Sequence, residues 1–317
     1  SVSGTFKAIV STMKVNSDGS KPEPQQPEYA VTDYLAYILS DLPECTASSS
    51  DVEGCYFRGE QDGNYVDYYG KIFRAYYSNK NSNVVRIVYD GDYTIAPYGQ
   101  LGECISTGCC NNGRYAYIAL GDTTASSRFK KVMDSYLDDF YNLLNNGKTL
   151  TYLRSQTFTS YYNVEEYSLR TNNSYYNGLN VAGNIITNGI KTKNLSKKVA
   201  LLSLGDYKEI ADCSSDSSCR SATNYLTGDS KFWLLDFYAA RFGVGAHNRG
   251  INPAEIYEYA VNEDGSITYD GTTKAQNAST SQIQTSELGV RPTLELGAAR
   301  VKGGNGSKNN PYIVKVD

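Results

Sequence analysis

The amino-acid sequence predicts an α+β fold in which one long helix packs against a mixed, mostly antiparallel sheet. Three observations indicate this fold. Apolar residues recur at helical spacing over 127–145, and short strand-like segments alternate with turn signals over 68–97. The last third of the chain then carries a hairpin pattern and two further strand-like segments. We expect residues 65–317 to form this domain.

The first 27 residues are expected to lie apart from this domain. Val2, Phe6 and Ile9 alternate loosely with polar residues, so residues 1–20 predict a strand, and the prolines of 21–27 make a stiff linker. An isolated strand is unstable in water and pairs with any open sheet edge that it reaches. If that edge belongs to its own domain, the protein is a monomer. We favour the edge of a neighbouring copy, which gives self-association into a filament.

Residues 28–64 predict a helix followed by a loop that a disulfide closes. The helix spans 27–42, with its apolar side chains on one face and a proline at either end. Three strands are then expected, over 68–77, 84–89 and 93–97. The Asp90-Gly91-Asp92 segment between the last two is either half of a calcium loop or a hairpin turn. The missing acidic ligand at EF-hand spacing favours the turn.

The longest expected helix spans 127–145, with serine caps before it and Gly147 just after it. A buried strand over 199–204 and a short helix over 205–213 follow. The only tryptophan, Trp233, lies in an apolar strand and is expected to be buried in the core. The remaining elements are a hairpin over 257–271 that turns at Asp264-Gly265, a strand over Gly289–Leu296, and a final strand that ends near Val316.

Four motifs in the last third of the chain together resemble one domain family. They are W-L-L, V-N-E-D-G-S-I, G-V-R-P-T-L-E-L and G-N-G-S-K-N-N-P-Y, at Trp233–Leu235, Val261–Ile267, Gly289–Leu296 and Gly304–Tyr312. Weaker matches continue upstream, at Lys198–Leu202, Gly205–Tyr207 and Tyr69–Arg74. Over roughly residues 65–317 the chain resembles a poorly characterised family found in surface and pseudopilin-like proteins of gut Firmicutes and their wall-less relatives.

The layout of that family is similar to the C-type-lectin-like fold of formylglycine-generating enzymes and of retroelement-diversified ligand-binding proteins. The resemblance therefore implies a C-type-lectin-like domain in a surface protein, either a pilus-like filament subunit or an adhesin. It does not imply formylglycine-generating activity. Those enzymes use a cysteine pair in the region matching Leu235–Arg291, and this chain has no cysteine after Cys219.

Composition narrows the classes of function. The chain has 317 residues, 40% of them hydrophobic, which is enough for a substantial core. The net charge of −4 offers no basic field, which argues against nucleic acid as a partner. No apolar run reaches the roughly 18–20 residues that span a bilayer, so we expect no membrane-spanning segment. The chain begins at Ser1, as expected for a processed or trimmed protein.

Seven cysteines occur in local clusters. A zinc site would need C-x-x-C pairs or histidine partners, and the chain has a single histidine. We therefore predict disulfides made in an oxidising, extracellular compartment, and no metal or other cofactor. The expected bridges are Cys45–Cys55, Cys213–Cys219, and one within the cluster of Cys104, Cys109 and Cys110. The pairing in that cluster stays open, and Cys104 with Cys110 is the candidate pair. Because seven is an odd number, one cysteine thiol is left over, and it is either free or bonded to another chain.

Side chains suited to chemistry are sparse. His247 lies in a glycine-rich loop without a nucleophile motif, and acidic pairs such as Glu165/Glu166 usually mark solvated faces. We expect a binding surface instead, on loops rich in Tyr, Asn and Arg: Tyr238, Arg241, His247, Asn248, Arg249, Tyr257 and Tyr259. The alternative for these residues is an ordinary solvated loop set.

The predicted function is a non-enzymatic surface protein that binds a cell-surface glycan or protein; the alternative is a secreted, glycan-directed hydrolase.

Overall fold

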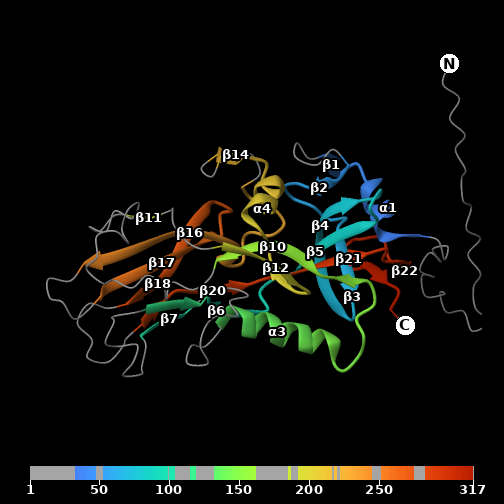
Figure 1. The fold of residues 1–317 in the computed structure, drawn as a ribbon. Helices are drawn as coiled ribbons and strands as arrows, with labels where there is room; N and C mark the ends of the chain where they lie inside the picture. The colour runs from blue at the N-terminus through green and yellow to red at the C-terminus, as the bar shows by residue number, and fades with distance from the viewer. Residues whose placement is uncertain are drawn as a thin grey trace, which may run out of the picture.

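A computed structural model describes the chain over 33–47, 53–98, 100–103, 115–118, 132–161, 185–186, 192–215, 218–219, 222–244, 251–274 and 283–316. The fold of the described residues is mostly β, with 44% strand against 15% helix, arranged as a curled half-barrel of sheet with short helices (Figure 1). The prediction of an α+β, C-type-lectin-like fold with a long packed helix is therefore wrong. The helices in the described residues are α1 (Leu35–Ser40), α3 (Val132–Asn145) and α4 (Leu204–Ile210).

A ten-stranded sheet forms one end of the molecule. Its main path runs β13-β21-β5-β4-β3-β23-β22, and β1, β2 and β9 pair at its sides. The predicted strands at 68–77 and 84–89 become a meander that turns first at Tyr69-Gly70, where both residues have positive φ, as a tight hairpin requires. The bounds are β1 (Cys45–Ala47), β2 (Cys55–Phe57), β3 (Tyr65–Tyr68), β4 (Lys71–Asn79), β5 (Val84–Tyr89), β9 (Leu153–Arg154), β13 (Ala200–Leu201), β21 (Pro292–Gly297), β22 (Val301–Gly303) and β23 (Tyr312–Val314).

A seven-stranded sheet forms the other end, and its long strands extend away from the C-terminus (Figure 1). Its main path runs β19-β18-β17-β16-β20-β6, and β11 pairs with β16. The bounds are β6 (Thr94–Pro97), β11 (Ile185–Ile186), β16 (Phe232–Val244), β17 (Ile251–Val261), β18 (Ile267–Lys274), β19 (Ile283–Thr285) and β20 (Glu287–Val290). Three separate pairs complete the strands: β7 (Gln100–Glu103) with β8 (Tyr115–Ile118), β10 (Gln156–Tyr161) with β12 (Thr192–Lys197), and β14 (Cys213–Ser215) with β15 (Ser218–Cys219).

The predicted hairpin at Asp264-Gly265 is confirmed as the turn between β17 and β18. The Asp264 carboxylate accepts a hydrogen bond from the Ser266 amide at 2.9 Å, which closes the turn. Gly265 has φ +81°, and a Cβ atom there would meet the Ala222 carbonyl oxygen at 1.6 Å. Glycine is therefore required both by the backbone conformation and by the close approach of the neighbouring loop.

The two sheets are joined by one antiparallel ribbon of two chain segments, which we call the crossing ribbon. One segment runs from β5 into β6, and the other from β20 into β21. Thr293 pairs with Val88 in the ten-stranded sheet, and Val290 pairs with Thr94 in the seven-stranded sheet. The single strand expected at Gly289–Leu296 is thus two strands in two sheets. Asp90-Gly91-Asp92 is a crossing segment rather than a hairpin turn, since β5 and β6 do not pair with each other.

A buried ion pair fastens the crossing ribbon where it changes sheets. Arg291 Nε donates to Asp92 Oδ1 at 2.6 Å, and the Arg291 guanidinium also donates to the Leu226 carbonyl and to Ser230 Oγ. The same guanidinium lies 4.2 Å from the centre of the Phe232 ring. A Cβ atom at Gly289 would meet Asp92 Oδ1 at 2.3 Å, so the Gly-Val-Arg-Pro motif makes room for the carboxylate that its arginine binds.

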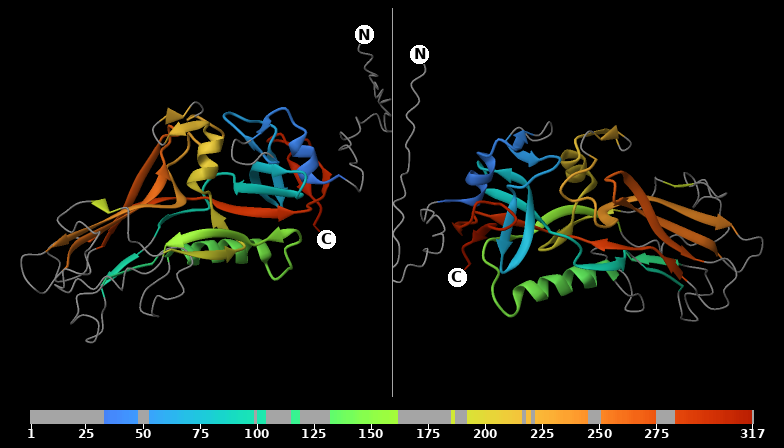
Figure 2. Two further views of the ribbon diagram at one scale, coloured as in Figure 1. Left: turned by 45° about the horizontal axis from the view of Figure 1, so that its top comes forward. Right: turned by 180° about the vertical axis from the view of Figure 1, so that it is seen from behind.

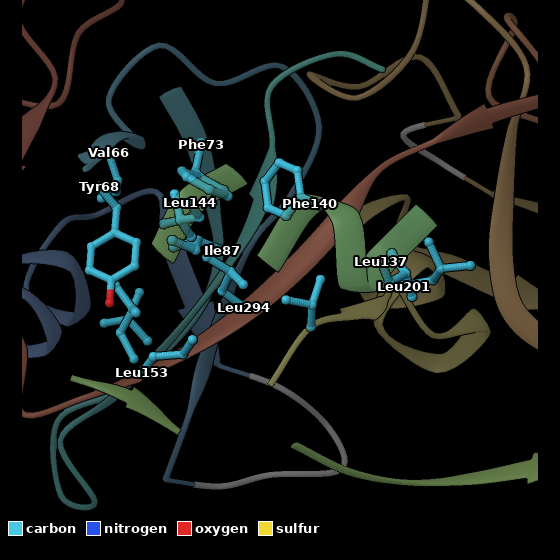
Figure 3. Packing of buried hydrophobic residues seen from close by; sticks show 14 of the residues in the cluster. Val66, Tyr68, Phe73, Ile87, Leu137, Phe140, Leu144, Leu153, Leu201 and Leu294 are labelled. Carbon is cyan, nitrogen blue, oxygen red and sulfur yellow. The ribbon is translucent and has the colours of Figure 1, made fainter. Parts of the chain in front are cut away.

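One large core lies under the crossing ribbon and includes residues from both sheets. Figure 3 shows the part of this core where α3 packs against the ten-stranded sheet. The inward face of α3 supplies Leu137, Phe140 and Leu144, and the Phe140 ring makes edge-on contacts with Tyr89 and Tyr93. Trp233 is 1% exposed, as predicted, and its indole Nε1 donates to the Ala96 carbonyl at 2.8 Å. Helices α3 and α4 lie on opposite sides of the crossing ribbon (Figure 2).

The fold class was mispredicted mainly because paired strands replaced an expected loop region, while the helices in the described residues are short. Helix α1 covers six residues of the predicted 27–42 helix, and α3 begins at Val132 within the described residues. The Gly- and Tyr-rich stretch after Trp233 was expected to be loop. It forms instead most of β16 and β17, because its Phe, Tyr, Ile and Val residues suit a long paired ribbon.

Several predictions fall on residues that the structure does not describe. They are the strand over 1–20 with Val2, Phe6 and Ile9, and the linker over 21–27. The described part of the 28–64 segment joins the ten-stranded sheet, because Tyr56 of β2 pairs with Tyr77 of β4. Among the residues with described positions, no helix is both long and apolar enough to cross a bilayer.

Candidate functional site

A polar pocket of about 640 Å³ lies between helix α4 and the β1–β2 pair. Two side chains fix the first turn of α4. Ser203 Oγ accepts a hydrogen bond from the Asp206 amide, and the Asp236 carboxylate accepts one from the Leu204 amide. Because Asp236 extends from β16, the second contact holds α4 against the seven-stranded sheet. The pocket therefore has one rigid helical wall.

Asp206 connects this helical wall to the strands. Tyr56 Oη donates to its Oδ1 at 2.7 Å, and Ser203 Oγ donates to its Oδ2 at 2.7 Å. Arg86 Nη1 lies 3.7 Å from the same carboxylate, while Arg86 Nε donates to Glu295 at 3.1 Å. Burial, reinforced by the neighbouring Asp206 charge, raises the pKa of the Tyr56 hydroxyl. Tyr56 therefore acts as a hydrogen-bond donor and not as a base.

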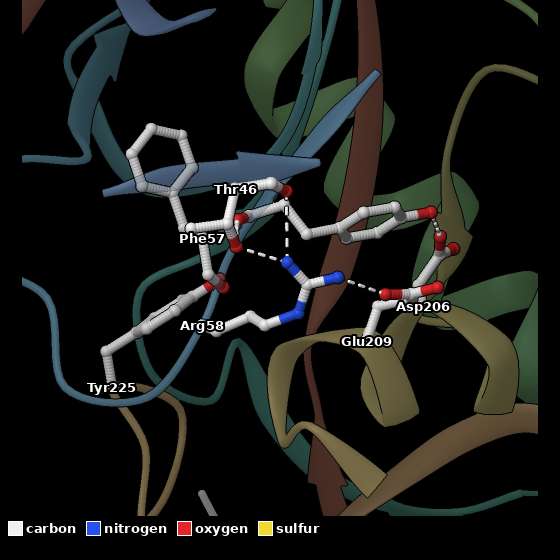
Figure 4. Close-up of polar contacts among 7 residues, drawn as sticks. Thr46, Phe57, Arg58, Asp206, Glu209 and Tyr225 are labelled. Carbon is white, nitrogen blue, oxygen red and sulfur yellow. Dashed lines mark hydrogen bonds and ion pairs between the residues drawn. The ribbon is translucent and has the colours of Figure 1, made fainter. Parts of the chain in front are cut away.

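Arg58 lines the pocket and extends from the end of β2 towards α4 (Figure 4). Its guanidinium donates to the Thr46 carbonyl at 3.0 Å, to the Thr46 hydroxyl and to the Glu209 carboxylate. Arg58 thus ties β1 to α4, two elements that the sequence separates by more than 150 residues. The pocket also carries Lys208 and Asp212, so its lining bears both signs of charge.

The two disulfides of the described residues flank this pocket. Cys45–Cys55 links β1 to β2, and Cys213–Cys219 links β14 to β15 directly after α4. Both bridges confirm the prediction. The cluster of Cys104, Cys109 and Cys110 lies outside the described residues.

Removing either bridge is expected to destabilise the pocket walls. Replacing both cysteines of one pair by serine should lower the free energy of unfolding by about 2–3 kcal/mol, because the open loop regains chain entropy in the unfolded state. Urea denaturation of the intact protein and of each double serine variant measures the change. A loss below about 0.5 kcal/mol for both pairs would show that the bridges do not stabilise the fold.

The contribution of Asp236 to the free energy of unfolding is expected to depend on pH. Burial raises the pKa of its carboxyl; the Leu204 amide opposes this rise and the Asp206 charge adds to it. As pH rises from the ordinary carboxyl value, the unfolded chain releases this proton before the folded one does. The contribution of Asp236 to stability therefore falls as pH rises through that window.

The Asp236→Asn variant should lack this loss, because the amide oxygen still accepts from Leu204 and carries no charge. We expect it to gain stability relative to the parent protein between pH 4 and pH 7. Urea denaturation at both pH values measures this difference. A difference that stays constant with pH would contradict the assignment.

The binding residues expected from sequence lie elsewhere. Tyr238 and Arg241 are in β16, and Tyr257 and Tyr259 are in β17, so these four belong to paired strands and not to loops. Tyr259 is partly buried and pairs in register with Tyr269 of β18. His247, Asn248 and Arg249 lie outside the described residues. Tyr259, the one residue of this set whose side chain the structure describes, does not line the pocket beside α4.

Sequence reasoning missed the residues that build the pocket, namely Tyr56, Arg58, Asp206 and Glu209. One signal was present: Gly205-Asp206-Tyr207 belongs to a motif that resembled the surface-protein family. Tyr207 is buried and donates to the Gly265 carbonyl at 2.6 Å, so this motif fixes α4 on the hairpin turn while Asp206 faces the pocket.

The described residues contain no group of three or more His, Cys, Asp or Glu side chains placed to hold a metal ion. Asp92, considered above as a calcium ligand, is bonded to Arg291 and Ser230. Comparisons with protein families, with curated proteins and with solved structures find no match to this chain.

Proposed function

We propose that this protein is a non-enzymatic bacterial surface protein that binds a glycan or protein partner in the pocket beside α4. The observation that carries the proposal is the pair of disulfides beside the pocket walls. Short disulfide loops persist in oxidising environments outside the cytosol. Here they hold in place the strands and the helix whose side chains line the pocket, among them Tyr56, Arg58 and Lys208. The motif resemblance to surface proteins supports the same setting.

The arrangement of charges favours binding over catalysis. Asp206 is held by Tyr56, Ser203 and Arg86, and Glu209 is paired with Arg58. Carboxylates fixed in this way present oriented hydrogen-bond acceptors to a ligand. A general acid or base, in contrast, needs a group that exchanges a proton with the substrate.

A binding screen with a hydrolysis assay on the same ligands tests this proposal. The folded, oxidised protein is applied to immobilised glycans and surface proteins, and soluble products are followed by mass spectrometry. We expect binding without product, and about tenfold weaker binding for Lys208→Gln. Lys302→Gln, an exposed charge on β22, is the matched control. Product release would favour the alternative, a secreted hydrolase, and equal binding by the two variants would place the ligand outside this pocket.

We further propose that the N-terminal strand, through Val2, Phe6 and Ile9, pairs with a neighbouring copy. The described chain enters beside edge strand β22, where Tyr34 bridges to Arg300, so the preceding segment starts at a sheet edge. Deleting residues 1–20 should leave a folded monomer, whereas the intact chain should associate as concentration rises. Sedimentation velocity measures both. Assembly of the deleted protein would contradict this proposal.

A further inference from the structure

A second pocket, of about 370 Å³, lies where four distant segments meet. Tyr34 precedes α1, Tyr152 follows α3, Ala298 and Arg300 lie between β21 and β22, and Lys315 follows β23. We call it the terminal pocket. It shares no lining residue with the pocket beside α4. The function proposed above therefore does not account for it.

Strained backbone surrounds the terminal pocket. Tyr152 has φ +69° and Ala298 has φ +53°, in the left-handed region that side chains other than Gly, Asn and Asp seldom adopt. Backbone hydrogen bonds connect the segments that carry these residues. The Gly297 amide donates to the Tyr152 carbonyl at 2.9 Å, and the Ala298 amide donates to the carbonyl of Asn83, which has φ +52°. Such clusters persist where the surrounding structure enforces them, and they concentrate at binding sites.

The side chains of the terminal pocket combine positive charge with aromatic rings. Arg300 Nη2 donates to Tyr34 Oη at 3.1 Å, and the guanidinium lies 5.0 Å from the centre of the same ring. The Lys315 amide donates to the Arg300 carbonyl at 2.7 Å, which sets the two cationic residues side by side. Among the described residues that line the pocket there is no carboxylate, although the whole chain carries a net charge of −4.

We propose that the terminal pocket binds an acidic saccharide. Its carboxylate or sulfate group pairs with Arg300 and Lys315, because a guanidinium and an ammonium together match an oxyanion. Its sugar ring packs on Tyr34 and Tyr152, which offer an apolar face and a polar hydroxyl. A bare inorganic anion would use the cations and leave the rings without a role.

Titration calorimetry of the full chain tests this inference. The probes are an oligogalacturonate, a sulfated galactan oligosaccharide, a neutral galactan oligosaccharide of equal length, and sodium sulfate. We expect one or both acidic saccharides to bind at least about tenfold more tightly than the neutral one and the inorganic salt, with affinity falling as ionic strength rises. The carboxylate and sulfate arms show which acidic group the pocket prefers.

Two variants test whether the ligand binds in the terminal pocket. Lys315→Gln removes an exposed charge and should weaken binding about tenfold, whereas Lys302→Gln, on nearby β22, should leave it unchanged. Tyr152→Asn removes a ring at a position where Asn tolerates positive φ, and it should also weaken binding; thermal unfolding shows that the variant is folded. The proposal would be overturned if neutral and acidic probes bound equally, or if no probe bound. It would also be overturned if inorganic sulfate alone bound tightly, or if the two lysine variants had equal effects.

Discussion

Replacing Arg291 by Met is expected to lower the free energy of unfolding by about 3–5 kcal/mol, because it leaves the Asp92 carboxylate without its partner in a largely buried place. The change also removes donors to the Leu226 carbonyl and to Ser230, and the stacking of the guanidinium on Phe232. All these contacts lie where the crossing ribbon passes from one sheet to the other. Urea denaturation measures the loss.

Two further variants identify the cause of that loss. Arg291→Lys keeps the charge, but its donors sit on one nitrogen and cannot replace Nε, Nη1 and Nη2 at three separate acceptors, so it should recover only part of the stability. Lys302→Met removes an exposed cation and should change stability by less than about 0.5 kcal/mol. If Arg291→Met behaved like Lys302→Met, the ion pair would not be what fastens the two sheets.

Trp233→Ala is expected to cost about 3–5 kcal/mol, since it opens a large cavity beneath the crossing ribbon. The indole is buried, contacts Tyr98 edge-on with ring centres 5.7 Å apart, and donates to the Ala96 carbonyl of β6. Trp233→Phe keeps most of the ring volume and loses the donor, so a smaller cost of about 1–3 kcal/mol is expected. Denaturation curves for the two variants measure these costs, and equal costs would show that the hydrogen bond outweighs the packing.

Local signals explain what the sequence predicted correctly. The Asp264-Gly265 turn, the strand at 84–89, the helix after Ser203 and the disulfides Cys45–Cys55 and Cys213–Cys219 all depend on residues close together in the chain. Turn geometry, capping and short disulfide loops act over a few residues, so the sequence pattern reports them directly.

Long-range pairing explains what the sequence did not predict. Gly289–Leu296 has the pattern of one strand, but Arg291 carries the chain from one sheet into the other because Asp92, 199 residues away, binds it there. The strands β16 and β17 are likewise stabilised by pairing with each other. This pairing outweighs the low strand preference of the glycines, which had suggested a loop. The fold class was wrong for this reason.

The candidate site could not be read from the sequence for a related reason. Tyr56 and Asp206 lie 150 residues apart and meet through one hydrogen bond. Neither lies in a catalytic or metal-binding motif, and each looks like an ordinary surface residue until the β1–β2 pair and α4 are brought together. Motif spacing reports chemistry only when the residues of a site are neighbours in the chain.

The oxidation state of the cysteines in the natural protein tests the central claim most directly. The protein is isolated from its own cells under conditions that trap free thiols, digested without reduction, and analysed by mass spectrometry. If the protein is a surface protein with disulfides beside its binding pocket, we expect peptides joined through Cys45–Cys55 and through Cys213–Cys219. Alkylated, free thiols at these four cysteines would contradict both the proposed extracellular location and the disulfide-linked pocket walls on which the proposed binding function depends.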